Sequence, residues 1–260
     1  MSLLLRLTPS RTEDYQGCPL RFKLLHLDRL GPRERRPLPH LSFGASLHEA
    51  LYRFYDRGGY EAVPPSALPR LLAQSWRADG YVDARDEAAY RAAAVRILER
   101  YYAAFRDEPV CHLGHELFLQ ARVRVGGTCL LLSGKIDRLS VWPDGHLQVV
   151  DYKTGTGPVP SPEKLAADLP TFLYYVLARL NYPEYSRVDV AHVYLQPTAT
   201  VTAAYDAEAV AERKAALTRL VAEIAAGDFP PKPSHHCAWC EVRPLCPALR
   251  HTETDLDSLF

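Results

Sequence analysis

The sequence lacks several features that would assign it at once to a class of protein. No apolar stretch approaches the roughly 18 residues that a membrane span needs. The first residues show neither the charged leader nor the long apolar segment of a signal peptide. No Gly-x-x-x-x-Gly-Lys-Ser/Thr loop is present, which excludes an ATPase motor built on that loop. We therefore expect a cytoplasmic location and no membrane partner.

An excess of basic residues is also lacking. The 260-residue chain has 31 Lys and Arg against 31 Asp and Glu, so its formal net charge is zero. Nucleic-acid-binding domains usually carry a basic surplus, yet binding needs only a local patch. Arg21 with Lys23, and the arginines at positions 29, 33, 35 and 36, could form such a patch or a solvated surface. With 47% hydrophobic and 24% charged residues, the composition indicates a globular protein with one sizeable core.

The most informative segment spans residues 134–155. Two apolar, β-rich runs flank a Pro143-Asp144-Gly145 turn, which indicates a β-hairpin. Its pairing would bring Asp137 and Asp151 together, and Lys153 shares a face with Asp151 because side chains alternate along a strand. Two carboxylates bind a hard divalent cation, and an ammonium group can stabilise a developing anion. The pattern predicts a metal site that hydrolyses phosphate esters; a surface hairpin with two solvated acids is the alternative.

Gly134-x-x-Asp137-Arg138, followed by Val-Val-Asp151-Tyr-Lys153-Thr-Gly, resembles the PD-(D/E)xK nucleases, specifically their RecB-like branch. That branch includes the nuclease domains of bacterial helicase–nucleases and a CRISPR-adaptation nuclease family. The resemblance implies an α/β, restriction-endonuclease-like fold with an αβββαβ core and a helical lobe. It also implies Mg²⁺ or Mn²⁺ as cofactor, DNA as partner, and association with a helicase or with other repair or CRISPR-adaptation proteins.

Two further metal contacts follow from this resemblance. Gly44-x-x-x-His48 matches a family motif whose imidazole ligates the metal together with the two acids. The backbone carbonyl of Tyr152 should face the same metal. Taken alone, His48 would be interpreted as a core histidine beside its leucine neighbours. Glu116 could hold a metal-bound water, or be a strand-end carboxylate in solvent.

A Gln-x-x-x-Tyr motif usually follows the sheet in these nucleases. Here Thr171 stands where glutamine is expected, and Tyr175 keeps the tyrosine. We therefore expect Tyr175 at the catalytic site, together with Asp137, Asp151 and Lys153. The threonine puts the substrate contact of this helix in doubt and leaves the metal site untouched.

The cysteines form a second pattern. Cys237-x-x-Cys240 and Cys246 lie close together in the C-terminal region, and Cys18 lies near the N-terminus. This arrangement resembles the iron–sulfur staple of several RecB-like nucleases, which implies a [4Fe–4S] cluster held by the four thiolates. Tetrahedral zinc is an alternative, including a site completed by His235 or His236, and so are unliganded thiols. Cys111 and Cys129 have no partners at metal spacing and are expected in the core.

Local patterns predict the order of the secondary structure. Ser10-Arg11-Thr12-Glu13 has the form of a capping box that starts a helix ending before Gly31. Further helices are expected over 42–57, 66–79, 85–106, 168–180 and 206–226, and strands over 116–125, 129–141, 147–152, 188–196 and 200–205. We interpret 1–260 as a single nuclease domain. Segments 1–40 and 228–249 would bind the cluster and so join the two ends, and 42–227 would form the helical insert and the core.

These patterns together predict a metal-dependent deoxyribonuclease with a two-metal mechanism. We expect it to act on single-stranded DNA or on DNA ends, as an exonuclease in DNA repair would. The alternative is a catalytically vestigial module that binds DNA or a partner and is stabilised by an iron–sulfur cluster or zinc. Strand polarity, oligomeric state and pathway do not follow from the sequence.

Overall fold

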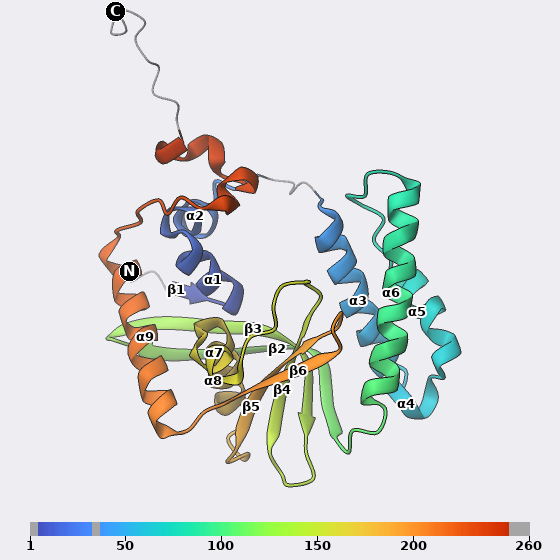
Figure 1. Ribbon diagram of the computed structural model, residues 1–260. Coiled ribbons are helices and arrows are strands. Elements are labelled where there is room, and N and C mark those ends of the chain that lie inside the picture. The colour runs from blue at the N-terminus through green and yellow to red at the C-terminus, as the bar shows by residue number, and fades with distance from the viewer. Residues whose placement is uncertain (1–4, 33–36, 250–260) are drawn as a thin grey trace, which may run out of the picture.

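The computed structural model describes residues 5–32 and 37–249, and its centre is a six-stranded mixed sheet (Figure 1). Three antiparallel strands form a meander, a fourth runs parallel to the last of these, and a fifth returns antiparallel. A short N-terminal strand lies parallel to the start of β3. The strands are β1 (Leu5–Leu7), β2 (Cys111–Val125), β3 (Thr128–Val141), β4 (Leu147–Lys153), β5 (Val188–Tyr194) and β6 (Ala199–Ala204).

Helices cover both faces of this sheet (Figure 1). One face carries α1 (Pro9–Gly17), α7 (Pro162–Ala167), α8 (Leu169–Asn181) and α9 (Ala207–Ala226). The other carries a lobe of α3 (Pro39–Asp56), α4 (Gly59–Ala62), α5 (Leu68–Ser75) and α6 (Ala84–Phe105). α2 (Pro19–Phe22), a π-turn (Lys23–Leu27) and single 3₁₀ turns (Pro65–Ala67, His235–Trp239, Arg243–Leu245, Pro247–Leu249) complete the described chain. Every helix within the described ranges is too short or too polar to span a membrane.

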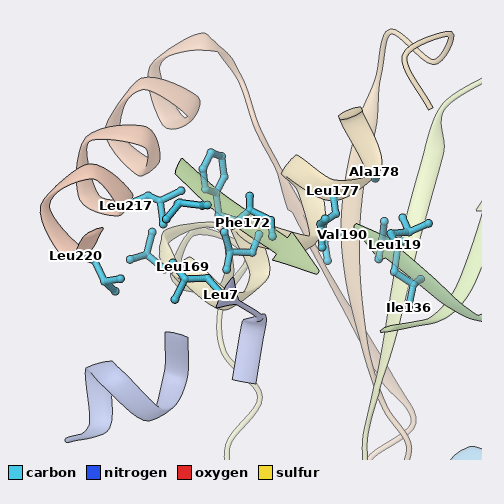
Figure 2. Close-up of a cluster of buried hydrophobic side chains, with 14 of the residues drawn as sticks. Leu7, Leu119, Ile136, Leu169, Phe172, Leu177, Ala178, Val190, Leu217 and Leu220 are labelled. Carbon is cyan, nitrogen blue, oxygen red and sulfur yellow. The ribbon is translucent and has the colours of Figure 1, made fainter. Parts of the chain in front are cut away.

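Alternation along the central strands builds two separate cores. Val149 and Val190 point to the α8 side, where the cluster in Figure 2 includes Phe172 of α8 and Leu217 of α9. Their neighbours Val150 and Ala191 point to the helical lobe. Because both faces of β4 and β5 are buried, these strands are nearly continuous apolar runs, as expected for parallel strands between helical layers. Asp151 lies near the end of the run in β4, and Asp137 lies on the neighbouring strand β3.

The fold agrees with a mixed α/β, restriction-endonuclease-like core, and several boundaries differ from the sequence prediction. α1 is capped by Thr8, whose side chain accepts a hydrogen bond from the Arg11 amide, so Ser10 is not the N-cap. Pro9 then occupies the first turn, where its missing N–H has no cost. The predicted single helix is interrupted at Cys18, which has extended backbone angles before Pro19. A residue that precedes proline is disfavoured in the α conformation.

Cys111 and Cys129 were expected in the core, and both are exposed. They lie at positions of the long β2–β3 hairpin opposite Val141 and Arg124. Cys129 alternates with the buried Leu130, so its side chain faces away from the core. The arginines at 33, 35 and 36 of the predicted basic patch lie outside the described residues.

Gly134 allows helix α8 to approach the sheet closely. A Cβ at this position would lie 3.0 Å from a methyl group of Leu177 and 3.3 Å from the ring of Tyr174. Leu177 cannot withdraw freely, because it is fully buried in the core. The glycine three positions before Asp137 therefore determines how near Tyr174 comes to the acidic residues.

We predict that Gly134→Ala destabilises the protein by about 1–3 kcal/mol, the usual cost of overpacking a close contact. Gly17→Ala is the matched control, because a Cβ there meets nothing within 4 Å. Urea denaturation followed by circular dichroism measures both free energies of unfolding. Equal stability of the two variants would show that α8 can move away without cost.

Candidate active site

Strands β3 and β4 separate at the point where the acidic residues lie. Their backbone ladder runs from Val141–Leu147 to Arg138–Val150 and then stops. One step further, Oδ2 of Asp137 accepts a hydrogen bond of 2.7 Å from the backbone N–H of Tyr152. The side chain of Asp137 thus replaces the missing ladder bond, and the strands diverge beyond it.

Helix α3 places His48 against this carboxylate. Nδ1 of His48 lies 3.1 Å from Oδ1 of Asp137. The helix can come this close because Gly44, one turn earlier, has no side chain: a Cβ there would lie 2.9 Å from Oγ1 of Thr154, just beyond β4. The spacing of glycine and histidine therefore has a steric reason in this chain, since the glycine brings the helix to the sheet and the histidine meets the acid.

Glu116 joins the same group from strand β2. Its neighbours His115 and Leu117 pair with Arg138 and Ile136, so Glu116 lies opposite Asp137. Its backbone has φ of 54°, in the left-handed region that non-glycine residues rarely adopt. Such strain persists only where the surroundings impose it, and it is concentrated at functional sites. Ligand atoms of His48, Glu116 and Asp137 all lie within 4.8 Å of one another.

Asp151 lies beside this trio and faces different partners. Its Oδ2 lies 2.6 Å from Nζ of Lys153, and its side chain is 13% exposed whereas that of Lys153 is 41% exposed. Its neighbour in register on β5 is the buried His192. The pattern of alternation thus predicted the shared face of Asp151 and Lys153 correctly.

Tyr174 is a residue of the site that the sequence pattern missed. Burial raises the pKa of its hydroxyl, and so do the nearby charges of Asp151 and Asp137 and a hydrogen bond to Asp151. Tyr175, the residue expected from the motif, packs its ring against Phe172 and Tyr205, with centroids 5.8 and 4.6 Å away. One residue of helical phase, about 100°, separates the two orientations.

At this site the charges of neighbouring groups outweigh the effect of burial on the pKa values. Burial opposes protonation of His48, but the hydrogen bond to Asp137 and the charges of Asp137 and Asp151 outweigh it and raise the pKa of the imidazole. Burial likewise opposes ionisation of Asp151, and Lys153 and the nearby histidines outweigh it and lower the pKa of that carboxyl. Lys153 has a raised pKa for the reciprocal reason. Asp151 is therefore available as an anionic ligand at neutral pH.

The trio opens into a cavity of about 840 Å³ between the helical lobe and the ends of β3 and β4. The donors facing it, one imidazole and two carboxylates, suit a divalent cation such as Mn²⁺ or Mg²⁺. In the same cavity, Lys135 forms an ion pair with Glu116. A cation bound by Glu116 would replace this ammonium group as the partner of the carboxylate.

The predicted cluster cysteines share one region. Cys18, Cys237, Cys240 and Cys246 all line a cavity of about 400 Å³ between α1, α2 and the C-terminal turns. Within the described residues, no three of their sulfur atoms lie within 4.8 Å of one another. The two ends of the chain are nevertheless joined here, because the Leu20 amide donates to the Pro230 carbonyl, at 3.3 Å.

Two residues of the predicted basic patch are engaged within the protein. Arg21 is paired with Asp14 and, at 3.1 Å, with Glu241 of the C-terminal segment. Lys23 is paired with Asp28. These cations are thus partly neutralised, and Arg21 serves to hold the two ends of the chain together.

The comparison with known families decides the class of this arrangement. Residues 6–247 match the PD-(D/E)XK nuclease superfamily. The chain belongs to that superfamily. Membership in a superfamily of nucleases implies a nucleic-acid substrate and hydrolysis of phosphodiester bonds. The match includes every residue of the acidic site and all four cysteines of the second cavity.

Two solved structures give distant likenesses. One is a protein from Eubacterium rectale described as a "putative exonuclease", with 14% identity, a TM-score of 0.45, and coverage of 97% of this chain and 89% of that one. Another is the crystal structure of SSO0001, with 13% identity, a TM-score of 0.38, and coverage of 88% and 94%. At these TM-scores the likenesses do not bear on activity. No curated protein matches the chain.

We predict that His48 titrates above the ordinary histidine value of 6.5 in the metal-free protein. The contribution of its pairing with Asp137 to stability is then complete below pH 6.5 and is lost as the pH rises through the folded pKa. In Asp137→Asn the pKa should fall below 6.5, because burial then becomes the dominant effect. NMR titration of the His48 ring in EDTA measures both values, and an unchanged titration in the variant would contradict the assignment.

Proposed function

We propose that this protein is a divalent-metal-dependent deoxyribonuclease that hydrolyses phosphodiester bonds in single-stranded DNA or at DNA ends. One observation carries the proposal: His48, Glu116 and Asp137 present ligand atoms within 4.8 Å of one another, directly beside the Asp151–Lys153 pair. These residues come from α3, β2, β3 and β4, so their meeting is a product of the tertiary fold rather than of local sequence.

Asp137, Glu116 and His48 would hold Mg²⁺ or Mn²⁺, and Asp151 would contribute from the other side of the diverging strands. The Tyr152 carbonyl remains a predicted further ligand, and its amide is already bonded to Asp137. Bound cations supply stabilisation of the attacking and leaving oxygens of an in-line displacement. One imidazole and two carboxylates, with a third carboxylate nearby, are compatible with one ion or two.

Lys153 would act directly on the substrate. Its ammonium group is held by Asp151 at 2.6 Å but remains 41% exposed, so it can reach a phosphate oxygen or orient a water. Tyr174, whose raised pKa keeps its hydroxyl protonated, would orient Asp151 by donating a hydrogen bond. In this proposal Tyr174, rather than the Tyr175 expected from the motif, acts at the acids.

We predict that Asp151→Asn abolishes cleavage, because it removes an anionic ligand while preserving the shape of the side chain. Lys153→Met should lower kcat by about 10²-fold or more, the usual loss for one electrostatic stabiliser. The measurement is digestion of a labelled single-stranded oligonucleotide with Mn²⁺, with EDTA as the blank. Cleavage by Asp151→Asn at the wild-type rate would refute the site.

Tyr174→Phe and Tyr175→Phe form a matched pair for the same assay, since each removes one hydroxyl from adjacent positions of α8. Loss of activity confined to Tyr174→Phe would support the contact with the acids. Loss confined to Tyr175→Phe would instead restore the assignment made from the motif.

We also propose that Cys18, Cys237, Cys240 and Cys246 hold a [4Fe–4S] cluster. All four line one cavity, and Cys18 already accepts a hydrogen bond from the Lys232 amide, at 3.4 Å. Zinc with bonds of about 2.3 Å would bring tetrahedral thiolates to within about 3.8 Å of each other. Four thiolates also suit a [4Fe–4S] cluster, and the resemblance to the iron–sulfur staple of RecB-like nucleases supports the cluster over a single zinc ion.

We predict that Cys18→Ser loses the brown colour and the iron, and lowers the melting temperature as much as Cys240→Ser does. The reason is that metal-binding energy at such sites is largely folding energy, and the C-terminal segment has few buried apolar residues to hold it. Cys111→Ser, at an exposed position, is the control and should change neither. Full iron content in Cys18→Ser would exclude it as a ligand, and stoichiometric zinc in the wild-type protein would exclude the cluster.

A further inference from the structure

The cavity at the acidic residues is much larger than metal binding requires. Its volume of about 840 Å³ lies in the upper part of the range for pockets that enclose whole organic ligands. The side opposite the acids is formed by the helical lobe, and it includes Leu41, Phe43, Arg77, Tyr90 and Ala93. These side chains are largely apolar and aromatic, with one cation in Arg77; Glu49 of α3 also lines the cavity and is paired with Arg53. The sheet side carries Glu116 and Asp137, with Lys135 beside them.

Tyr90 is the central ring of this wall. It is half-buried on α6 and is held by neighbouring rings on two sides. Its centroid lies 5.3 Å from that of the buried Phe43, in an edge-to-face arrangement, and 5.2 Å from that of Tyr81. Tyr81 in turn stacks on Trp76, at 5.6 Å and an angle of 10°. The ring facing the cavity is therefore preorganised by an aromatic row, which lowers the entropy lost when a flat ligand stacks on it.

The surroundings of Tyr90 suit a nucleotide. Leu41, at the start of α3, is 53% exposed and adds apolar surface on the same side of the cavity. The backbone amide of Arg77 is fixed to Oγ of Ser46, at 2.9 Å. Among the described residues, no carboxylate lies within ion-pair distance of the exposed Arg77 guanidinium. A cation without a partner beside an aromatic platform matches the alternation of phosphate and base along a single strand.

Resting on the proposed nuclease function, we infer that the Tyr90 wall is a stacking subsite for an unpaired nucleobase, with Arg77 contacting an adjacent phosphate. Helix α3 sets the distance between the stacking subsite and the acidic site. Phe43 on this helix supports Tyr90, and just over one turn later His48 contacts Asp137. A base in a duplex already has both faces covered by its neighbours and cannot stack on this ring without leaving the helix. The substrate is therefore single-stranded nucleic acid.

Binding in EDTA tests this inference without any cleavage. The probes are a fluorescein-labelled single-stranded 12-mer of thymidylate and a strand with the same phosphates in which abasic residues replace the nucleosides. Stacking of a base is expected to strengthen binding by about 5- to 100-fold, so the wild-type protein should prefer the thymidylate strand by this factor. A blunt duplex of the same length should bind more weakly than the single strand.

The variants separate the two contacts. Tyr90→Ala should remove the preference for bases, and Tyr90→Phe should retain it, because only the ring is needed. Arg77→Ala should weaken binding to both strands equally. It should also reduce the slope of log K against log salt by about one. Tyr52→Ala is the control for disturbance of the lobe, since Tyr52 is half-buried on α3 but does not line the cavity. It should behave like the wild-type protein.

Equal binding of the thymidylate and abasic strands by the wild-type protein would overturn the subsite, and so would tighter binding of the duplex. This result needs no variant, so it holds even if Tyr90→Ala fails to fold. Cleavage with Mn²⁺ is scored separately. A protein that prefers bases but does not cut would refute the nuclease proposal and leave the subsite standing, and a protein that cuts without preferring bases would do the reverse.

Discussion

The carboxylate of Asp137 connects the parts of the site, because its two oxygens face different elements. Oδ2 accepts from the Tyr152 amide on β4, and Oδ1 meets His48 on α3. Strand separation, the position of the helical lobe and the presentation of ligands therefore depend on one side chain. A metal ion would compete for Oδ1, whereas the bond of Oδ2 to the backbone can persist and keep β4 in place.

Two helices approach the sheet closely to make this geometry possible. Each does so at a glycine, where no side chain stands in the way. Gly44 lets α3 reach Thr154 at the end of β4, and Gly134 lets α8 bring Tyr174 to the acids. Helices from opposite faces of the sheet thus converge on the same strand ends. Arg138, next to Asp137, is 1% exposed and bonds to Tyr55 of α3, at 2.9 Å, and to Tyr101 of α6, at 3.3 Å. The strand that carries the acid is thereby tied to the lobe that carries the histidine.

What could be predicted from sequence is what local rules determine. The hairpin around Gly145, with its φ of 82°, and the shared face of Asp151 and Lys153 follow from turn chemistry and alternation. Glu116 was expected near the metal only through the family resemblance, because no local rule predicts the left-handed residue in a strand on which its position depends. Whether Tyr174 or Tyr175 faces the acids depends on how α8 is rotated against the sheet, and tertiary packing decides that. Thr8 and Ser10 are both good N-cap residues. Thr8 is the cap because Pro9 after it occupies the first position of the helix.

The ion pairs show how a chain of zero net charge would have to bind a nucleic acid. Arg21 and Lys23 are paired within the terminal segments, so they contribute little free positive charge to a nucleic-acid surface. An acidic site would repel a polyanion unless cations offset its carboxylates, and metal ions would do so only locally. Affinity for the rest of the strand then cannot rely on net charge alone, and local contacts have to supply it. The aromatic wall around Tyr90 is such a contact. Stacking on it would supply binding affinity that the neutral chain does not obtain from its net charge. A protein that binds in this way should depend on base exposure more than on overall charge, which is a reason for it to act where strands are already unpaired.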